Sequence, residues 1–410
     1  MSFTPAPIAT ISSDVLSRLK SDDDRKRFVI ADAANSLARY AVAGLLGRKS
    51  APNSNHDVYA LVPDKSARSA RDLEKLGAKL IEYKCNDPAD IRRAFKEAAA
   101  PTLILLPPQS PDLVVRTAMI LTNTAETVTN VIMWSSIGTE HADALSFAGG
   151  DNKNDDEGDM YPSALLLLKE AEELVLHGTD TATTPKKGNP KKRGHAPKVR
   201  RCVLRAGFPL QHFFALSPLI MNRGIIPFTS DAARIAWIEM QDMGRATADL
   251  LRSGALPEDW DGATRVLCAP ESTSGPMLIT AANEGLSHPL AFAKVQLTEM
   301  RAFLLQARMA PFDLSLAMGW WRLFDEGKLD VAAPELADLL GGPDRVTPIR
   351  TFFAENEDRF VPSHLPLGAR NEVAIISDMA ALVLADVNAS QQPENGVPDS
   401  KKGAKWCLIQ

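Results

Sequence analysis

Short apolar runs alternate with amphipathic stretches along the first half of the chain. In the stretch that leads to Gly47, Leu37, Ala41 and Leu45 recur at the spacing of one helix face, and similar stretches predict helices at about 66–76, 110–127 and 162–177. Strands that alternate with helices are typical of βαβ units and of a parallel sheet buried on both faces. The predicted strands are 27–31, 57–62, 78–83, 102–106, 130–135 and 200–205.

This order of elements predicts an α/β protein, a Rossmann-type doubly wound parallel sheet with a smaller, mostly helical C-terminal domain. After Leu250 the chain is expected to be irregular and helical, with the strongest helix over about 291–309. Two polar stretches interrupt the pattern, an acidic one at 151–159 and a basic one rich in Gly, Pro and Thr that is expected to be disordered. The predicted parts are an N-terminal tail 1–24, a Rossmann domain 25–270 with the basic insertion at about 179–198, a C-terminal domain 271–387 and a flexible tail 388–410.

Composition narrows the function classes. The chain has 410 residues, 45% of them hydrophobic, and its 46 Lys and Arg against 51 Asp and Glu give a net charge of −5, which argues against direct nucleic-acid binding. Its 4 Cys show no C-x-x-C spacing and its 7 His form no H-x-x-x-H pair, so neither a disulfide scaffold nor a zinc site is expected. No apolar run has the length of a membrane span and no signal peptide is recognisable, which favours a soluble intracellular protein.

The turn after the first predicted strand lacks the glycines of a dinucleotide-binding loop. At G-x-x-G-x-x-G spacing the three positions are Asp32, Asn35 and Ala38. Ala is tolerated at the last position and Asn accepts a left-handed backbone, but a carboxylate beside a diphosphate costs on the order of a few kcal/mol. Two interpretations stay open. Either this is a modified cofactor loop, or Asp32 or Asn35 caps the first helix and the phosphate site is lost.

The end of the second strand is equally open. Asp64 would suit the ribose hydroxyls of NAD, Lys65 would suit the 2′-phosphate of NADP, and both are also ordinary turn residues. The cofactor expectation is therefore NADP, NAD or none. The residues expected to contact a cofactor are Asp32, Asn35, Leu37, Ala38, Asp64, Lys65, Pro107, Ser135 and Ser136.

Several segments between Arg27 and Glu355 together resemble the NmrA-like family of atypical short-chain dehydrogenases/reductases. The resemblance implies a Rossmann domain with a smaller domain closing over a cleft, and an activity similar to that of NAD(P)H sensors and transcriptional co-regulators or of quinone and phenylcoumaran-type reductases. The sequence departs from the family at the glycines, at Pro63 in place of an Arg and at Lys84 in place of an acid, which predicts weak cofactor binding. The segments that carry the resemblance are 59–62, 86–88, 131–138, 204–208, 224–227, 239–244 and 347–353.

No ordinary catalytic dyad is present. Short-chain dehydrogenases need a Tyr followed four residues later by a Lys that lowers the phenol pKa, and no Tyr of this chain has one. The substitute is Lys169, as acid/base in the cleft, unless it pairs with Glu172 or Glu173 on a solvated helix face. Phe208, His212 and Phe213 are expected in the substrate cleft, where packing is the alternative role for each residue.

The chain ends in Cys407-Leu408-Ile409-Gln410, a prenylation box of the farnesyl type. One prenyl chain anchors weakly, and nearby lysines at 401, 402 and 405 would add attraction to an anionic leaflet. Three roles stay open for the basic residues at 186–201. They would strengthen this membrane attraction, act as a nuclear-import patch or form a solvated insertion.

The sequence therefore favours a membrane-tethered regulatory or redox-sensing protein, with weak or absent NAD(P)(H) binding and a protein partner. Its expected location is the cytosolic face of membranes, with the nucleus as the alternative. The alternative hypothesis is an NAD(P)H-dependent oxidoreductase, similar to quinone or phenylcoumaran reductases, that acts on a small organic substrate.

Overall fold

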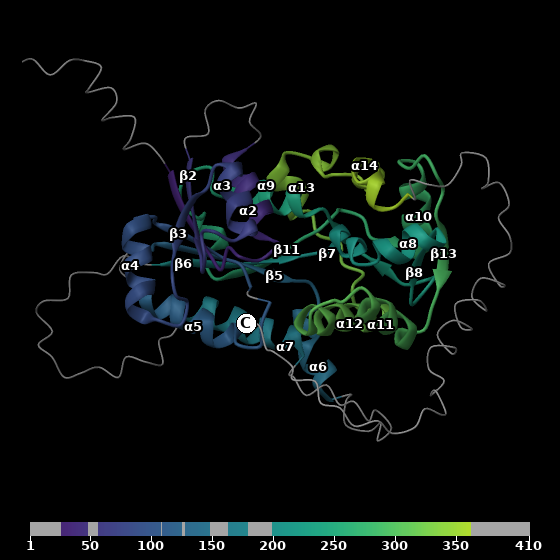
Figure 1. Ribbon diagram of the computed structural model, residues 1–410, viewed down its shortest axis with the longest axis horizontal. Coiled ribbons are helices and arrows are strands. Elements are labelled where there is room, and N and C mark those ends of the chain that lie inside the picture. The colour runs from purple at the N-terminus through teal and green to yellow at the C-terminus, as the bar shows by residue number, and fades with distance from the viewer. Residues whose placement is uncertain are drawn as a thin grey trace, which may run out of the picture. The chain divides into compact units, whose positions relative to one another are not determined.

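A parallel sheet of seven strands lies at the centre of the computed structural model (Figure 1). The strand order is β11-β6-β5-β4-β1-β2-β3, so the order reverses between β1 and β4. The whole of β4 and β5 is buried, which explains why their sequences are apolar without alternation. The strands are β1 (Lys26–Ala31), β2 (His56–Val62), β3 (Lys79–Glu82), β4 (Thr102–Leu105), β5 (Asn130–Ser136), β6 (Arg200–Ala206) and β11 (Ala263–Leu267).

Helices cover both faces of this sheet (Figure 1). One layer holds α2 (Ala38–Leu46), α3 (Arg68–Leu76), α9 (Met240–Leu250) and α13 (Glu335–Leu340), and the other holds α4 (Pro88–Ala98), α5 (Leu113–Thr124) and α7 (Ala164–His177). The α2 and α9 backbones nearly touch, because a Cβ on Gly44 would lie 2.2 Å from the backbone of Gly244. This crossing allows no side chain at either glycine, and it fixes the position of α2 beside the carboxyl end of β1.

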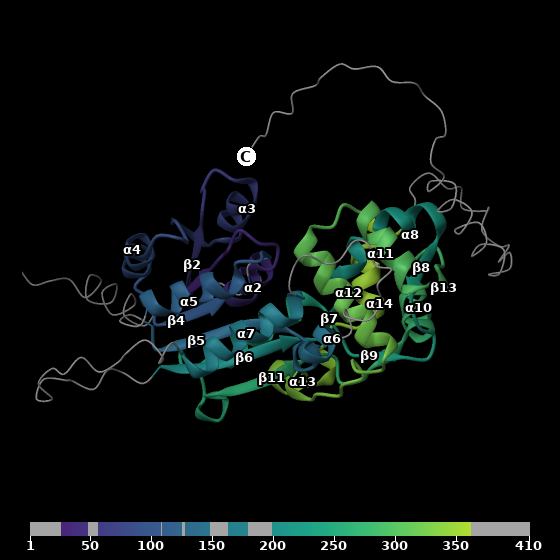
Figure 2. The same ribbon diagram turned by 90° about the horizontal axis from the view of Figure 1, so that it is seen from below.

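Most of the rest of the described chain lies beyond the carboxyl ends of β5 and β6 (Figure 2). Its short strands pair two by two, β7 with β10, β9 with β12 and β8 with β13. Their bounds are β7 (Phe208–Pro209), β8 (Ile225–Phe228), β9 (Arg234–Ile235), β10 (Trp237–Ile238), β12 (Thr273–Ser274) and β13 (Ala291–Lys294). The helices are α8 (Ser217–Arg223), α10 (Gly275–Asn283), α11 (Leu297–Gln306), α12 (Pro311–Asp325) and α14 (Ile349–Glu355), and α6 (Ala142–Phe147) follows β5.

The structure describes residues 26–47, 56–107, 109–124, 128–147, 163–178 and 199–361, and all of them belong to one compact unit. The predicted N-terminal tail, acidic stretch, basic insertion and prenylation box at Cys407 lie outside these residues. The division into domains at residue 270 stays a prediction. No helix in the described ranges is long and apolar enough to cross a membrane.

The parallel α/β sheet predicted from the sequence is confirmed, and all six predicted strands are present. Two predictions for the later chain were wrong. The stretch after Leu250 contains a seventh sheet strand, β11, and the predicted helix over 291–309 begins as strand β13, which pairs with β8. The helix itself starts at Leu297, where Gln296 and Glu299 form a reciprocal capping box.

Candidate functional site

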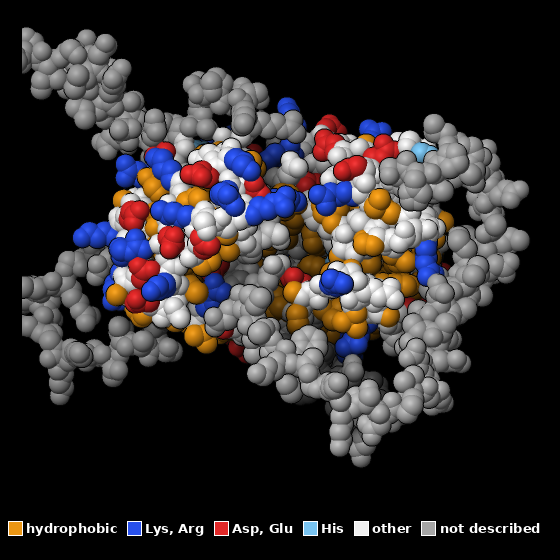
Figure 3. Space-filling view, in the orientation of Figure 1, with side chains coloured by type: hydrophobic (Ala, Val, Ile, Leu, Met, Phe, Trp, Pro, Cys, Tyr) orange, Lys and Arg blue, Asp and Glu red, His pale blue; other side chains and the backbone are white. Residues whose placement is uncertain are grey.

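A cavity of about 350 Å³ opens at the carboxyl ends of β1, β4, β5 and β6. In open α/β sheets this crevice, where the strand order reverses, is the usual ligand site. In Figure 3, hydrophobic side chains lie in the hollow between the part of the molecule that carries α2 and the part that carries α8 and α12. Of the predicted site residues, those that line the cavity are Leu37, Pro107, Ser135, Ser136 and His212.

Asn35 occupies the N-terminus of α2, where a dinucleotide would place its diphosphate. Its Oδ1 accepts hydrogen bonds from the backbone N–H groups of Leu37 (2.9 Å) and Ala38 (3.2 Å), and its Nδ2 donates to the carbonyl of Pro107 (3.2 Å). These N–H groups are the ones that a helix offers to an anion. The amide oxygen of Asn35 thus takes the place that a phosphate oxygen would need.

Asp32 sits in the same turn with φ at +54°, the left-handed region that a glycine adopts freely. Its carboxylate forms an ion pair with Arg116 of α5 and accepts a hydrogen bond from the Tyr83 hydroxyl at 3.1 Å. Burial raises the pKa of Asp32, against the opposing effects of Arg116 and Tyr83. The sequence argument placed this carboxylate beside the diphosphate, but in the structure it points to Arg116 and does not line the cavity.

The end of β2 has the geometry of an ordinary turn. The exposed Asp64 accepts from the backbone N–H and the hydroxyl of Ser66, both at 2.7 Å, just before α3 begins. These two bonds lower the pKa of Asp64. Lys65 is exposed, Ala38 is buried in the core, and none of the three lines the cavity.

The end of β5 places two hydroxyls at the cavity, and they differ in their partners. Ser136 donates to the carbonyl of Ile137 (2.9 Å) and accepts from the indole N–H of Trp320 on α12 (2.8 Å). The hydroxyl of Ser135 is buried and has no hydrogen-bond partner in the part of the chain that the structure describes. A buried polar group without a partner costs stability, so Ser135 is available to a bound ligand.

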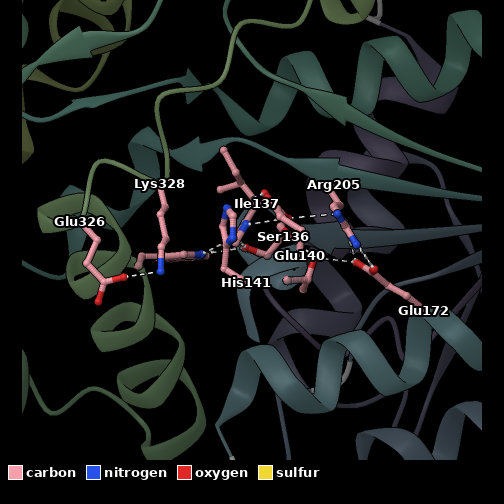
Figure 4. A network of polar contacts seen from close by, with 11 residues as sticks. Ser136, Ile137, Glu140, His141, Glu172, Arg205, Glu326 and Lys328 are labelled. Carbon is pink, nitrogen blue, oxygen red and sulfur yellow. Dashed lines mark hydrogen bonds and ion pairs between the residues drawn. The ribbon is translucent and has the colours of Figure 1, made fainter. Parts of the chain in front are cut away.

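A network of charged groups holds the loop after β5 in place (Figure 4). The Arg205 guanidinium pairs with Glu172 of α7 at 2.6 Å and with Glu140 at 3.0 Å. The Thr139 hydroxyl lies between Glu172 Oε1 (3.0 Å) and the carbonyl oxygen of Ser136 (2.9 Å) and shares its single proton between these two acceptors. The network therefore links β6 and α7 to Ser136, which lines the cavity at the end of β5.

The three residues predicted for the substrate cleft divide between cavity and core. His212 lines the cavity, its Nε2 accepts from the Trp321 indole at 3.2 Å, and burial lowers its pKa to about 4, so the ring is neutral at physiological pH. Phe208 and Phe213 are fully buried and pack among other aromatic rings, away from the cavity lining. Packing is the role that the structure supports for both.

Lys169 lies on α7 but does not line the cavity, where its neighbour Leu168 does. Its ammonium forms an ion pair with Asp143 of α6, neither of the partners proposed from the sequence. One chemical group was missed altogether, the carboxyl of Asp313 on α12, which lines the cavity. A single acid in the apolar stretch Phe312-Asp313-Leu314 is the only local signal, and it could equally mark a helix start.

Solved structures with the same fold bind NADP(H). A triphenylmethane reductase from Citrobacter sp. in complex with NADP(H) is 14% identical and has a TM-score of 0.57, covering 80% of this chain and 99% of its own. An NADPH-dependent quinone oxidoreductase from Escherichia coli, in complex with NADPH, is 16% identical with a TM-score of 0.58 over the same shares. The negative transcriptional regulator NmrA, in complex with NADP, is 15% identical with a TM-score of 0.54, covering 81% of this chain and 95% of its own.

The chain has the Rossmann-type fold of these proteins. At this level of identity the likeness establishes the fold and not the activity. Neither a protein-family model nor a curated protein sequence matches the chain. The residues of the first turn do not fit a dinucleotide diphosphate, because Asn35 fills the helix N-terminus and no glycine lets a phosphate approach. In the described ranges no cluster of His, Cys, Asp and Glu could hold a metal ion.

Proposed function

We propose that the chain is a regulatory or sensing protein on an NmrA-like scaffold, which takes a small organic molecule in its cavity and binds NAD(P)(H) weakly or not at all. The hydrogen bonds of Asn35 to the first turn of α2 carry this proposal, because a diphosphate would have to displace them. The buried Asp32–Arg116 pair adds to it, since the positive charge of Arg116 is already neutralised by Asp32.

Calorimetric titration with NADPH, NADP and NAD tests the proposal. We expect the unchanged protein to show no binding or dissociation constants above roughly 100 μM, which corresponds to about −5.5 kcal/mol. The double variant Asp32→Gly/Asn35→Gly frees the helix N–H groups and Arg116 together, and should bind NADPH at least about tenfold more tightly. Asn222→Gly/Asp259→Gly, at two exposed positions outside the cavity lining, is the matched control.

Micromolar binding of NADPH by the unchanged protein would refute this proposal and favour the second function, an NAD(P)H-dependent reductase. One observation supports that alternative, the unpartnered hydroxyl of Ser135 in the crevice where open α/β sheets usually bind their ligands.

We further propose, from the sequence alone, that the protein is tethered to a membrane. A farnesyl group on Cys407 with the lysines at 401, 402 and 405 would hold the protein reversibly at an anionic membrane surface. There it would meet a protein partner.

A further inference from the structure

Asp313 is a carboxyl in an apolar cavity without a partner. It belongs to the first turn of α12, it is half-buried, and in the part of the chain that the structure describes it has no hydrogen bond or ion pair. Burial alone raises its pKa to about 6, so the group is still mostly ionised at pH 8. An acid in the first turn also stabilises a helix when it faces solvent, but Asp313 lines the cavity, where burial costs its carboxylate hydration.

The surroundings of Asp313 are aromatic. Phe214 and Trp320 line the same cavity, as do Tyr40 and Phe312. Aromatic faces attract a cation through their quadrupole and also stack on a flat apolar ring. Such walls accept a planar organic group, and they add to the attraction for a positive charge.

The charges of the other side chains at the cavity also favour a positively charged ligand. Asp313 is the one carboxylate among the described lining residues, and the one cationic lining side chain, Arg39, lies over the Tyr40 ring at 4.5 Å and donates to its hydroxyl. His212 is neutral, and the buried hydroxyl of Ser135 has no hydrogen-bond partner among the described residues. A cationic ligand would neutralise the unpaired Asp313 carboxylate, whereas Arg39 is exposed to solvent and already in contact with Tyr40.

We propose that the cavity binds an aromatic organic cation whose protonated nitrogen pairs with the Asp313 carboxylate while its rings stack between the aromatic walls. This inference rests on the proposed function, because it names the ligand class of the same cavity. It assigns Asp313 as the residue that decides between cationic and neutral ligands.

Three probes of one shape test this inference on the full-length protein at pH 8. They are 1-naphthylmethylammonium, the neutral 1-naphthylmethanol and the anionic 1-naphthoate, each titrated by calorimetry without dinucleotide. The ammonium should bind about tenfold more tightly than the alcohol or better, as expected for a charge-assisted hydrogen bond, and the naphthoate should bind most weakly. Asp313→Asn should bring the affinity for the ammonium to within about twofold of that for the alcohol.

Asp325→Asn is the matched control, because Asp325 is an exposed acid at the other end of α12 that does not line the cavity. It should keep the full preference for the ammonium. Equal binding of ammonium and alcohol by the unchanged protein, a preference that survives Asp313→Asn, or no binding of any probe would each overturn the inference and leave Asp313 as a helix-terminus residue. Tight NADPH binding in a separate titration would refute the proposed function and leave the ammonium preference standing, so the two failures are distinguishable.

Discussion

Replacing Arg116 by Met would leave the Asp32 carboxylate buried without its cation. Asp32 is 6% exposed and the Arg116 side chain 22%. Breaking a buried ion pair by removing one partner costs about 3–5 kcal/mol of unfolding free energy. Because Arg116 keeps some contact with solvent and the Tyr83 hydroxyl stays on the carboxylate, we expect the lower end of this range, about 3 kcal/mol at pH 7.5.

The loss should depend on pH in one direction. Burial already raises the pKa of Asp32 in the folded protein, and removal of Arg116 raises it further. As the pH falls through this raised pKa, the folded state takes up a proton that the unfolded state binds only at lower pH, so acidification favours folding of the variant. The deficit relative to the unchanged protein should therefore be largest at pH 7.5 and clearly smaller at pH 5.

Urea denaturation followed by tryptophan fluorescence at the two pH values measures this. Adding Asp32→Asn to Arg116→Met removes the unpaired charge and should restore most of the stability at pH 7.5. Arg252→Met is the control, because it breaks an ion pair with Asp249 in which the Arg side chain is 77% exposed, and it should cost less than about 1 kcal/mol. A loss for Arg116→Met that is the same at both pH values, or no larger than that of the control, would refute the assignment of a buried charge.

Two further predictions concern the residues singled out from the sequence. Since Lys169 pairs with Asp143 outside the cavity lining, Lys169→Ala should leave any NADPH-dependent turnover unchanged in a quinone reduction assay, and a loss of about 10²-fold would restore its role as general acid. The prenylation box predicts that Cys407→Ser shifts the protein from the membrane fraction to the cytosol on cell fractionation, and a mass spectrum showing an intact, unmodified C-terminal peptide would contradict the anchor.

The sequence alone was enough to predict six of the seven strands of the central sheet. Strands such as β4 and β5 are covered on both faces, so their residues are uniformly apolar and the runs stand out between helical stretches. The sequence did not predict β11, because this strand lies at the sheet edge and its residues, Ala-Thr-Arg-Val-Leu, are mostly half-buried. The sequence did not predict β13, because Ala291–Lys294 has no strand pattern of its own and takes its conformation from pairing with β8.

The site shows the same division. The sequence limited the first turn to two interpretations but could not choose between them, because the deciding partners are distant along the chain. Pro107 lies 72 residues from Asn35, and Arg116 lies 84 residues from Asp32. Asp313 reaches the cavity only because α12 packs over the end of β5, where the Trp320 indole bonds to Ser136, 184 residues away. Apolar periodicity reports which face of an element is buried, whereas the partner of a buried polar group is decided by tertiary packing.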